Sequence, residues 1–305
     1  MKSHDFGQFL FNSSTLNPLQ LSRLIKASKN SKPTLATKAI FLRLVSATEL
    51  TELFRQERKK LDDPLEVRVD SEGNFLSSIN FEKYDSIVKN LTAQSRAAHT
   101  LETADGRSFY LAQSLLDKGI ANFIKLEHIL EKYNRLEIPP FEKSFSEYYL
   151  LEKDEQKADY PFSLDAAKAV YDFLSENLST SIILLPPSET EDYPHFGATV
   201  RINGEIPIII GLIAKRNIFK KIAENYTGDV YDSQEDIFDV VSELLNVFTG
   251  HFTIRIASLL GVEEEPEPPR FGEINQNISA MKMLADIGTF YIYVGKEEIF
   301  QGREF

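Results

Sequence analysis

The first 135 residues contain a pattern that repeats four times, and this repeat limits the folds that the chain can adopt. In each copy an apolar or small residue is followed at once by asparagine or serine, and apolar or aromatic residues stand five and eight positions after the first. Asparagine and serine accept hydrogen bonds from the free N–H groups of a first helical turn, so each copy predicts a helix start. One such unit buries too little apolar surface to be stable alone, and the repeat therefore predicts four stacked helix–turn–helix units. The anchors are Leu16, Val45, Ile79 and Ala121, followed by the caps Asn17, Ser46, Asn80 and Asn122.

Two further features favour helices at these positions. Pro18 occupies a first helical position, and Ser46 with Glu49 matches a capping box. The alternative is four unrelated helices that share caps by chance, because the third copy lacks the upstream residue that the others have. That residue, six positions before the anchor, is Leu10, Ala39 or Leu115 in three copies and Gly73 in the third.

Composition excludes several classes of protein. A length of 305 residues favours two domains, and 42% apolar with 26% charged residues is typical of globular chains. The net charge of −12 and the lack of a dense Lys/Arg block argue against nucleic acid or an anionic membrane surface as partner. Without cysteine there is no disulfide or thiolate site, and the five scattered histidines predict no metal site.

The chain has no segment that suggests a membrane. The N-terminal stretch "MKSHDFGQFLFNSS" has an early acid and only a very short apolar run, unlike a signal peptide. The longest apolar stretch, "IPIIIGLIA" at 206–214, is far below the ~20 residues that span a bilayer. We expect a soluble, cytoplasmic protein without membrane insertion.

The pattern changes near residue 137. Residues 137–162 contain a Pro-Pro pair and mixed charge, which predicts a linker with a partly docked aromatic segment. The expected organisation is a helical-repeat domain over 1–136, this linker, and a second domain over 163–305.

The second domain mixes helices and strands. Ser163 is expected to cap a helix, Asn203-Gly204 predicts a hairpin, and Pro207 suggests that the second hairpin strand starts at a sheet edge. Helices are expected over 216–226 and 234–260. With the strand-like stretches "SIILLPP", "PRFGEI" and "GTFYIYVG", this order predicts an α+β fold with an antiparallel sheet packed by helices.

The helix over 234–260 carries a polar stripe. At about 100° per residue, Asp239, Glu243, Asn246 and Gly250 fall within roughly 60° of one another. Asparagine and glycine are poor residues for a helix interior, and no Lys or Arg on the stripe offers an ion pair. Periodicity alone leaves open whether this is a solvated surface or a site. The opposite, core-facing arc contains Ile237, Val240, Val241, Leu244, Leu245 and Phe248.

Pro269 completes a longer pattern. It follows Asn246 by twenty-three positions, so that Asp239, Glu243, Asn246 and Pro269 match D/S-x3-E-x2-N followed after twenty-two residues by P. This resembles the signature of the CheC/CheX/FliY phosphatases of bacterial chemotaxis, and Gly250 matches the glycine that usually follows in that family. The resemblance covers roughly residues 163–300, and the single signature is similar to CheX. Ser242 stands where the family often has glycine.

The resemblance implies a CheX-like fold and hydrolysis of the aspartyl phosphate on a CheY-like response regulator in chemotaxis or motility signalling. Asn246 would position the attacking water, and Glu243 would pair with a lysine of the regulator. Asp239 and Pro269 would shape the helix start and the adjoining loop. Mg²⁺ would sit on the partner, with no cofactor in this chain, and a homodimer is implied. A non-catalytic module that docks a regulator is the alternative.

The N-terminal domain resembles the helical repeats that precede type II secretion and type IV pilus ATPases. Some of those domains bind cyclic di-GMP through a motif with a basic residue before Leu-Gly, but Asp5-Phe6-Gly7 holds that place here. We therefore expect an interaction or regulatory domain, with a ligand sensor as the alternative.

Overall fold

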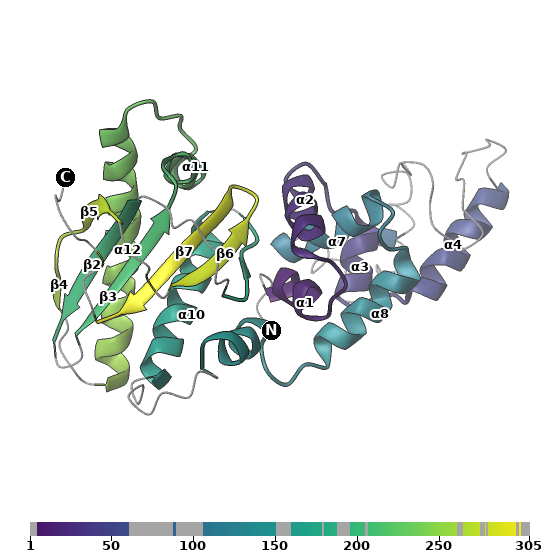
Figure 1. The fold of residues 1–305 in the computed structure, drawn as a ribbon. Coiled ribbons are helices and arrows are strands. Elements are labelled where there is room, and N and C mark those ends of the chain that lie inside the picture. The colour runs from purple at the N-terminus through teal and green to yellow at the C-terminus, as the bar shows by residue number, and fades with distance from the viewer. Residues whose placement is uncertain are drawn as a thin grey trace. The chain divides into compact units, whose positions relative to one another are not determined.

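The computed structural model divides into two compact units, Met1–Glu137 and Ile138–Phe305. The fold class is α+β: the elements described in the first unit are helices, and the second unit packs helices on an antiparallel sheet (Figure 1). The structure describes residues 5–60, 88–89, 106–150, 160–178, 180–187, 196–204, 207–260, 265–274, 278, 280–296 and 299.

Apart from residues 88–89, the described helices of the first unit form three helix–turn–helix pairs. They correspond to the first, second and fourth copies of the repeat, while the third copy lies outside the described residues. The pairs are α1 (Phe6–Asn12) with α2 (Pro18–Ser28), α3 (Leu35–Phe41) with α4 (Ala47–Lys60), and α7 (Arg107–Asp117) with α8 (Phe123–Asn134).

The predicted caps are confirmed in all three pairs. Asn17 Oδ1 accepts a hydrogen bond from the backbone N–H three residues on at 2.9 Å, and Asn122 Oδ1 does the same at 2.8 Å. Ser46 and Glu49 form the predicted capping box, with N–O distances of 3.1 Å and 2.9 Å. Each helix start is therefore set by side chains next to it in sequence.

The three turns share one backbone geometry. Three residues before each cap stands a residue with positive φ: Ser14 at 54°, Arg43 at 58° and Gly119 at 64°. The residue after it donates its N–H to a carbonyl five positions earlier, the 6→1 bond of a Schellman motif. The recurring upstream residue supplies that carbonyl, which explains its place in the pattern. The bonds are Thr15–Leu10 at 3.2 Å, Leu44–Ala39 at 2.8 Å and Ile120–Leu115 at 2.9 Å.

The apolar residues of the repeat form the core of the unit. Val45 and Leu53 of the second copy are half-buried, and the other anchors and repeat positions that the structure describes are buried. Burial of one face by neighbouring units is what a stacked repeat requires. The buried set is Leu16, Leu21, Leu24, Leu50, Ala121, Leu126 and Ile129.

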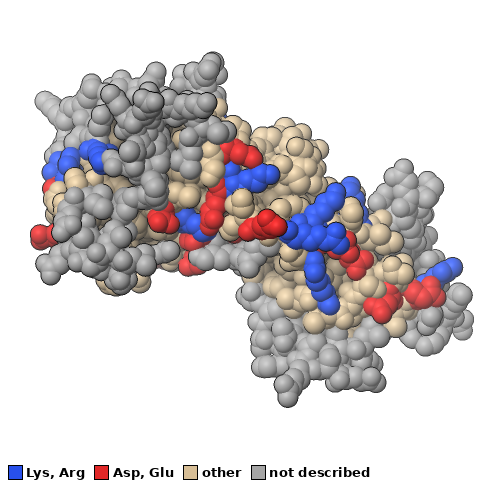
Figure 2. Space-filling model, turned by 90° about the horizontal axis from the view of Figure 1, so that it is seen from below, with Lys and Arg blue, Asp and Glu red and all other residues tan. Residues whose placement is uncertain are grey.

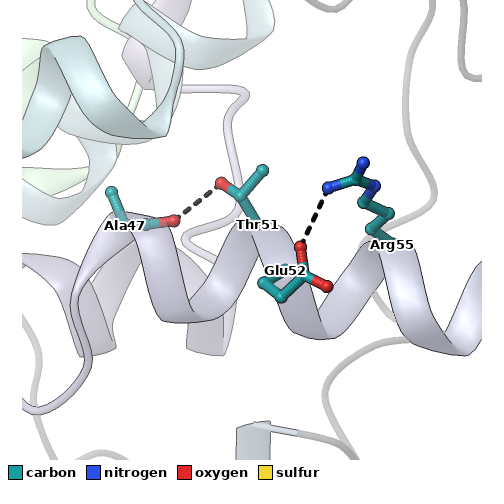
Figure 3. A network of polar contacts seen from close by, with 4 residues as sticks. All are labelled: Ala47, Thr51, Glu52 and Arg55. Carbon is teal, nitrogen blue, oxygen red and sulfur yellow. Dashed lines mark hydrogen bonds and ion pairs between the residues drawn. The ribbon is translucent and has the colours of Figure 1, made fainter.

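Along α4, contacts within the helix add to the cap (Figure 3). Thr51 Oγ1 donates to the carbonyl of Ala47 at 2.6 Å, and Arg55 pairs with Glu52 at 3.1 Å. Both members of the ion pair are exposed, so it contributes little to stability. The position of α4 therefore depends on its capping box and buried face.

The second unit is built on seven described strands, all paired antiparallel. The order across the sheet is β1-β6-β7-β3-β2-β4, and β5 pairs with β2 on the same side as β4. The strands are β1 (Ile183–Leu184), β2 (Phe196–Asn203), β3 (Ile208–Ala214), β4 (Glu265–Pro266), β5 (Arg270–Glu273), β6 (Met281–Ala285) and β7 (Gly288–Gly295).

Three helices pack with the sheet in one core: α10 (Tyr160–Asn177), α11 (Arg216–Thr227) and α12 (Gln234–Leu260). α12 lies against β2, and α10 lies against β7 (Figure 1). A second apolar cluster, formed in part by Ile209 and Tyr291, includes Ile274, Ile278 and Ile299 from the C-terminal stretch. The predicted α+β arrangement and the helix over 234–260 are confirmed.

Residues 140–150, which the sequence assigned to a linker, are helical instead. They form α9 (Pro140–Phe145) and the π-helix η2 (Ser146–Leu150). Phe141 is fully buried in the core of the second unit and stacks on Tyr171 of α10, with ring centroids 4.2 Å apart. Tyr149 donates its hydroxyl to the carbonyl of Leu185 at 3.2 Å. The docked aromatic segment that the sequence predicts within this stretch is thus confirmed, whereas an irregular linker over 140–150 is wrong; residues 151–159 lie outside the described residues.

Three other expectations need correction. α10 begins at Tyr160, so Ser163 lies inside its first turn and not at the N-cap position. Residues 202 and 208 pair across the predicted hairpin, so its loop is longer than a two-residue Asn203-Gly204 turn. Pro207 lies just before β3, which pairs with β2 and β7 and is central in the sheet, not at its edge.

Candidate functional site

α12 begins with a cap from its own sequence. Ser233 Oγ accepts from the backbone N–H of Asp236 at 3.0 Å. Glu235 and Asp236 place negative charge in the first turn, where it interacts favourably with the helix dipole. The helix therefore starts at the same point that the sequence predicts.

The apolar face of α12 sets its rotation against the sheet. Phe248 packs edge-on against Phe173 of α10, with centroids 5.3 Å apart, and stacks on Phe252 at 5.7 Å. Val240, expected on this face, is only half-buried. The remaining members of the expected arc are buried: Ile237, Val241, Leu244, Leu245 and Phe248.

With that face buried, the predicted stripe points away from the core. Asp239, Glu243 and Asn246 are exposed, and Gly250 is half-exposed. In the part of the chain that the structure describes, no hydrogen bond or ion pair engages the side chains of Asp239, Glu243 or Asn246. These groups therefore have no structural task within the described fold, and they are free to meet another molecule.

Pro269 comes from a different segment, the loop between β4 and β5. Two residues on, the ring of Phe271 stacks on Phe238 of α12, with centroids 4.6 Å apart. Phe238 directly precedes Asp239 in the helix. The loop that contains Pro269 is thus attached to the same half of α12 that carries Asp239.

Glu267 holds this loop in place, and sequence reasoning missed it. Its carboxylate accepts from Asn203 Nδ2 at 2.7 Å and from an Arg270 guanidinium nitrogen at 3.0 Å. Its backbone N–H donates to the carbonyl of Arg201 at 2.7 Å. The Glu-x-x-Arg spacing in "EPPR" could have indicated the Glu267–Arg270 ion pair. The bond to Asn203 had no local signal, because Asn203 is distant in sequence.

The first unit has a cavity of about 300 Å³ at the turn before α4. Its lining includes Arg43, Arg135, Glu127 and Glu131. The acids already have partners: Glu127 accepts from the N–H of Ala47 at 3.1 Å, and Glu131 lies 3.9 Å from Arg135. The cavity therefore offers a mixture of charges, and no one ligand class follows from it.

Asp5-Phe6-Gly7, which stands at the place of the cyclic di-GMP motif, is part of the core of the first unit. Asp5 and Phe6 are buried, and the ring of Phe6 lies 5.3 Å from that of Tyr133. Burial, and then the charge of Asp5, raise the pKa of the Tyr133 hydroxyl. Asp5-Phe6-Gly7 is therefore buried in the first unit, whereas Asp239, Glu243 and Asn246 on α12 are exposed.

Metal ligands in the described part of the chain indicate no second site. On the face drawn in Figure 2, acidic and basic side chains are intermixed. Among the described residues, no group of three or more His, Asp or Glu side chains could hold a metal ion. None of the described helices is long and apolar enough to cross a membrane.

Comparison with known proteins gives structural neighbours only. No protein-family model matches the sequence, and no curated protein sequence matches it. Similar solved structures include the chemotaxis protein CheX from Desulfovibrio desulfuricans, with 18% identity over 43% of this chain and 95% of that chain and a TM-score of 0.35. The CheX–CheY–BeF3–Mg²⁺ complex from Borrelia burgdorferi has 17% identity over the same shares and a TM-score of 0.35. FliY from Thermotoga maritima has 16% identity over 43% and 84% and a TM-score of 0.30.

Proposed function

We propose that the second unit hydrolyses the aspartyl phosphate of a CheY-like response regulator, with α12 as the surface that meets the regulator. One observation carries the proposal. The three α12 residues at the spacing of the phosphatase signature are exposed together and engage nothing in the described chain. Asp239 and Glu243 are like charges four positions apart, an arrangement that lowers helix stability, so the stripe is not explained by the stability of the helix.

The side chains suit the chemistry of phosphoryl transfer. This reaction needs an oriented nucleophile and stabilisation of charge more than covalent catalysis. The carboxamide of Asn246 both donates and accepts, so it can orient a water in line with the phosphorus. The water oxygen bonds to phosphorus as the P–O bond to the aspartate breaks, which leaves a carboxylate and dihydrogen phosphate.

Glu243 would dock the regulator. It lies one turn before Asn246, and its exposed carboxylate can pair with a lysine beside the phosphorylated aspartate. Mg²⁺ and the acyl phosphate would be supplied by the regulator, and this chain would need no cofactor. Asp239 and Pro269, on the helix start and the loop attached by the Phe238–Phe271 stack, would shape the surface around these two residues.

The test is the rate at which an acyl-phosphorylated receiver domain loses phosphate with and without the protein. Misplacement of a nucleophile by about 1 Å costs roughly 100-fold, so we expect Asn246→Ala to lower the rate by about that factor. Asn217→Ala, an exposed asparagine on α11, is the matched control and should retain full activity. Equal rates for wild type and Asn246→Ala would overturn catalysis at this site.

The alternative is an adaptor that docks the regulator without hydrolysis. It is favoured by the exposure of Glu243, which suits binding whether or not catalysis follows. An adaptor predicts binding that survives Asn246→Ala and is weakened by Glu243→Lys, with no effect of the protein on dephosphorylation. Glu176→Lys, an exposed charge reversal on α10, is the control for Glu243→Lys.

Two roles complete the proposal. The first unit would act as an interaction or regulatory scaffold.

The second unit would form a homodimer through its sheet, to be measured by light scattering on residues 138–305. That fragment keeps α9 and η2, because Phe141 and Phe145 belong to the core of this unit.

A further inference from the structure

Tyr149 of η2 stands inside the hydrogen-bond ladder between β1 and β6. The pairing of these strands ends at Leu184 with Met283, so the next pair in register is Leu185 with Lys282. A hydrogen-bonded antiparallel pair normally exchanges two bonds. One forms directly, from the N–H of Leu185 to the carbonyl of Lys282 at 2.9 Å. In place of the other, the Tyr149 hydroxyl accepts from the N–H of Lys282 at 3.2 Å and donates to the carbonyl of Leu185 at 3.2 Å. The hydroxyl therefore bridges two backbone groups that would otherwise bond each other.

The same segment reaches the other end of β1, which is an edge strand of the sheet. Phe141 of α9 stacks on Tyr171, with ring centroids 4.2 Å apart, and the Tyr171 hydroxyl donates to the carbonyl of Ile182 at 3.2 Å. The carbonyls on either side of β1, those of Ile182 and Leu185, thus each accept from a tyrosine. One of these tyrosines belongs to η2, and α9 packs on the other. Residues 140–150 therefore hold both ends of β1.

α9 and η2 also follow directly from the first unit along the chain. α8 ends at Asn134 and α9 begins at Pro140, so the five residues 135–139 connect the two helices. Pro139 and Pro140 have fixed φ angles, which stiffen this connection. η2 is a π-helix, a rare conformation that occurs mostly as single turns and often at functional sites. Tyr149 thus lies on the short covalent route from the first unit to the second.

Ring contacts continue from this segment to the candidate site. Phe173, on the same helix α10 as Tyr171, packs edge-on against Phe248 of α12, with centroids 5.3 Å apart. Phe248 is two residues after Asn246. α10 therefore contacts α9 through Tyr171 and α12 through Phe173. A change in how α9 and η2 dock on α10 would alter the packing of α12 beside Asn246.

We propose that Tyr149 is a regulatory wedge with two positions. In the first, its hydroxyl bridges Lys282 and Leu185, as in the structure, and η2 is docked. In the second, the hydroxyl turns to solvent, Lys282 and Leu185 bond directly, and the stack of Phe141 on Tyr171 loosens as η2 leaves the sheet edge. Both positions satisfy the two backbone groups, so a small force along the connection is enough to choose between them. The first unit would regulate α12 in this way.

Tyr149→Phe in the full chain distinguishes a wedge from a static contact. Phenylalanine keeps the ring beside Phe145 but cannot bridge the ladder, so the second position is favoured. Hydrogen exchange of residues 146–150 should become about fivefold faster, whereas the Lys282 amide stays protected because it now donates to Leu185. Loss of protection at Lys282 would show that the ladder does not close, and it would overturn the inference. Unchanged exchange of residues 146–150 would do the same.

Tyr148→Phe is the matched control. Tyr148 is half-buried in the same π-helix, and its hydroxyl bonds the side chain of Ser144 within the segment, not the ladder. Exchange of residues 146–150 and of Lys282 should equal that of the wild type. If Tyr148→Phe and Tyr149→Phe act alike, the effect belongs to any hydroxyl of η2 and the wedge is wrong.

Regulation of the site is measured on α12 in the same variants. With Tyr149→Phe we expect exchange around Phe248 to become about threefold faster, and dephosphorylation of a CheY-like receiver charged with acetyl phosphate to slow by about the same factor. The dephosphorylation part rests on the proposed function, and the exchange part does not. If the wild type dephosphorylates the receiver but Tyr149→Phe changes neither quantity, the regulation is wrong and the phosphatase stands. If the wild type has no activity, the proposed function is wrong, and hydrogen exchange decides on the wedge.

Discussion

Asn17 and Asn122 in the first unit accept hydrogen bonds from the helices that follow them, whereas Asn246 in the middle of α12 bonds through its side chain to nothing in the described chain. The glycines show the same contrast. Gly119 has a left-handed φ that the Schellman turn requires, while Gly250 has a helical φ and free space around it. Residues of the same type therefore serve the fold at Asn17, Asn122 and Gly119 and are without a structural task in the described chain at Asn246 and Gly250.

The largest effect on stability is expected from the two caps. Asn17→Ala and Asn122→Ala should each lower the free energy of unfolding of the first unit by about 1 kcal/mol. They cap different helices, so the double variant should lose about 2 kcal/mol. Hydrogen exchange of residues 6–50 and 107–134 measures this. If the double variant exchanges as the wild type does, these caps do not stabilise the repeat.

A loss equal to that of one cap, and smaller than that of the double variant, is expected from Gly119→Ala. The added Cβ meets nothing within 4 Å, so the effect comes only from the left-handed φ, at about 1 kcal/mol. The same substitution at Gly250 should act in the opposite direction, since its φ suits alanine. Thermal unfolding of both variants makes the comparison, and two shifts of the same sign would contradict it.

Asn246→Ala should change the free energy of unfolding still less. It should raise that free energy, whereas the cap variants lower it. Alanine is the better residue in a helix interior, so we expect a gain of roughly 0.5 kcal/mol alongside the loss of activity. Urea unfolding of the full chain, followed in the second unit, tests this. A loss of more than about 1 kcal/mol would mean that Asn246 has a structural role after all.

The smallest effect concerns the capping box at Ser46. Hydrogen bonds from the backbone and then the side chain of Ser46 lower the pKa of Glu49. A carboxyl whose pKa falls on folding stabilises the fold above its unfolded pKa, and that contribution is lost as pH falls through the folded value. The melting temperature of Glu49→Gln should therefore lie slightly below wild type at pH 7, and the gap should close as the pH drops below about 4. A gap independent of pH would contradict this.

The sequence predicted best what depends on neighbours along the chain. The described caps at Asn17, Ser46 and Asn122, the bounds of α12 and the exposure of Asp239, Glu243 and Asn246 all follow from residues within a turn or two of one another. Local hydrogen bonds and the period of the helix decide such features. The role of the site stays a prediction, because it depends on a second molecule.

Contacts between distant segments were harder to predict. Mixed charge around 137–162 suggested a linker that is only partly docked, yet residues 140–150 are helical and Phe141 stacks on Tyr171, thirty positions later, in the core. Pro207 suggested an edge strand, yet β3 is central because β7, far along the chain, pairs with its other side. In both cases a local composition signal was outweighed by apolar burial.

By itself, the sequence determined the helical repeat, the α+β class and the polar side of α12, because caps and periodicity act over a few residues. Only the tertiary structure decided that α9 and η2 belong to the second unit, that Glu267 holds the loop before Pro269, and that Phe271 joins that loop to α12. These depend on side chains that meet after the sheet has formed, and no spacing along the chain specifies which distant ring or carboxylate will be there.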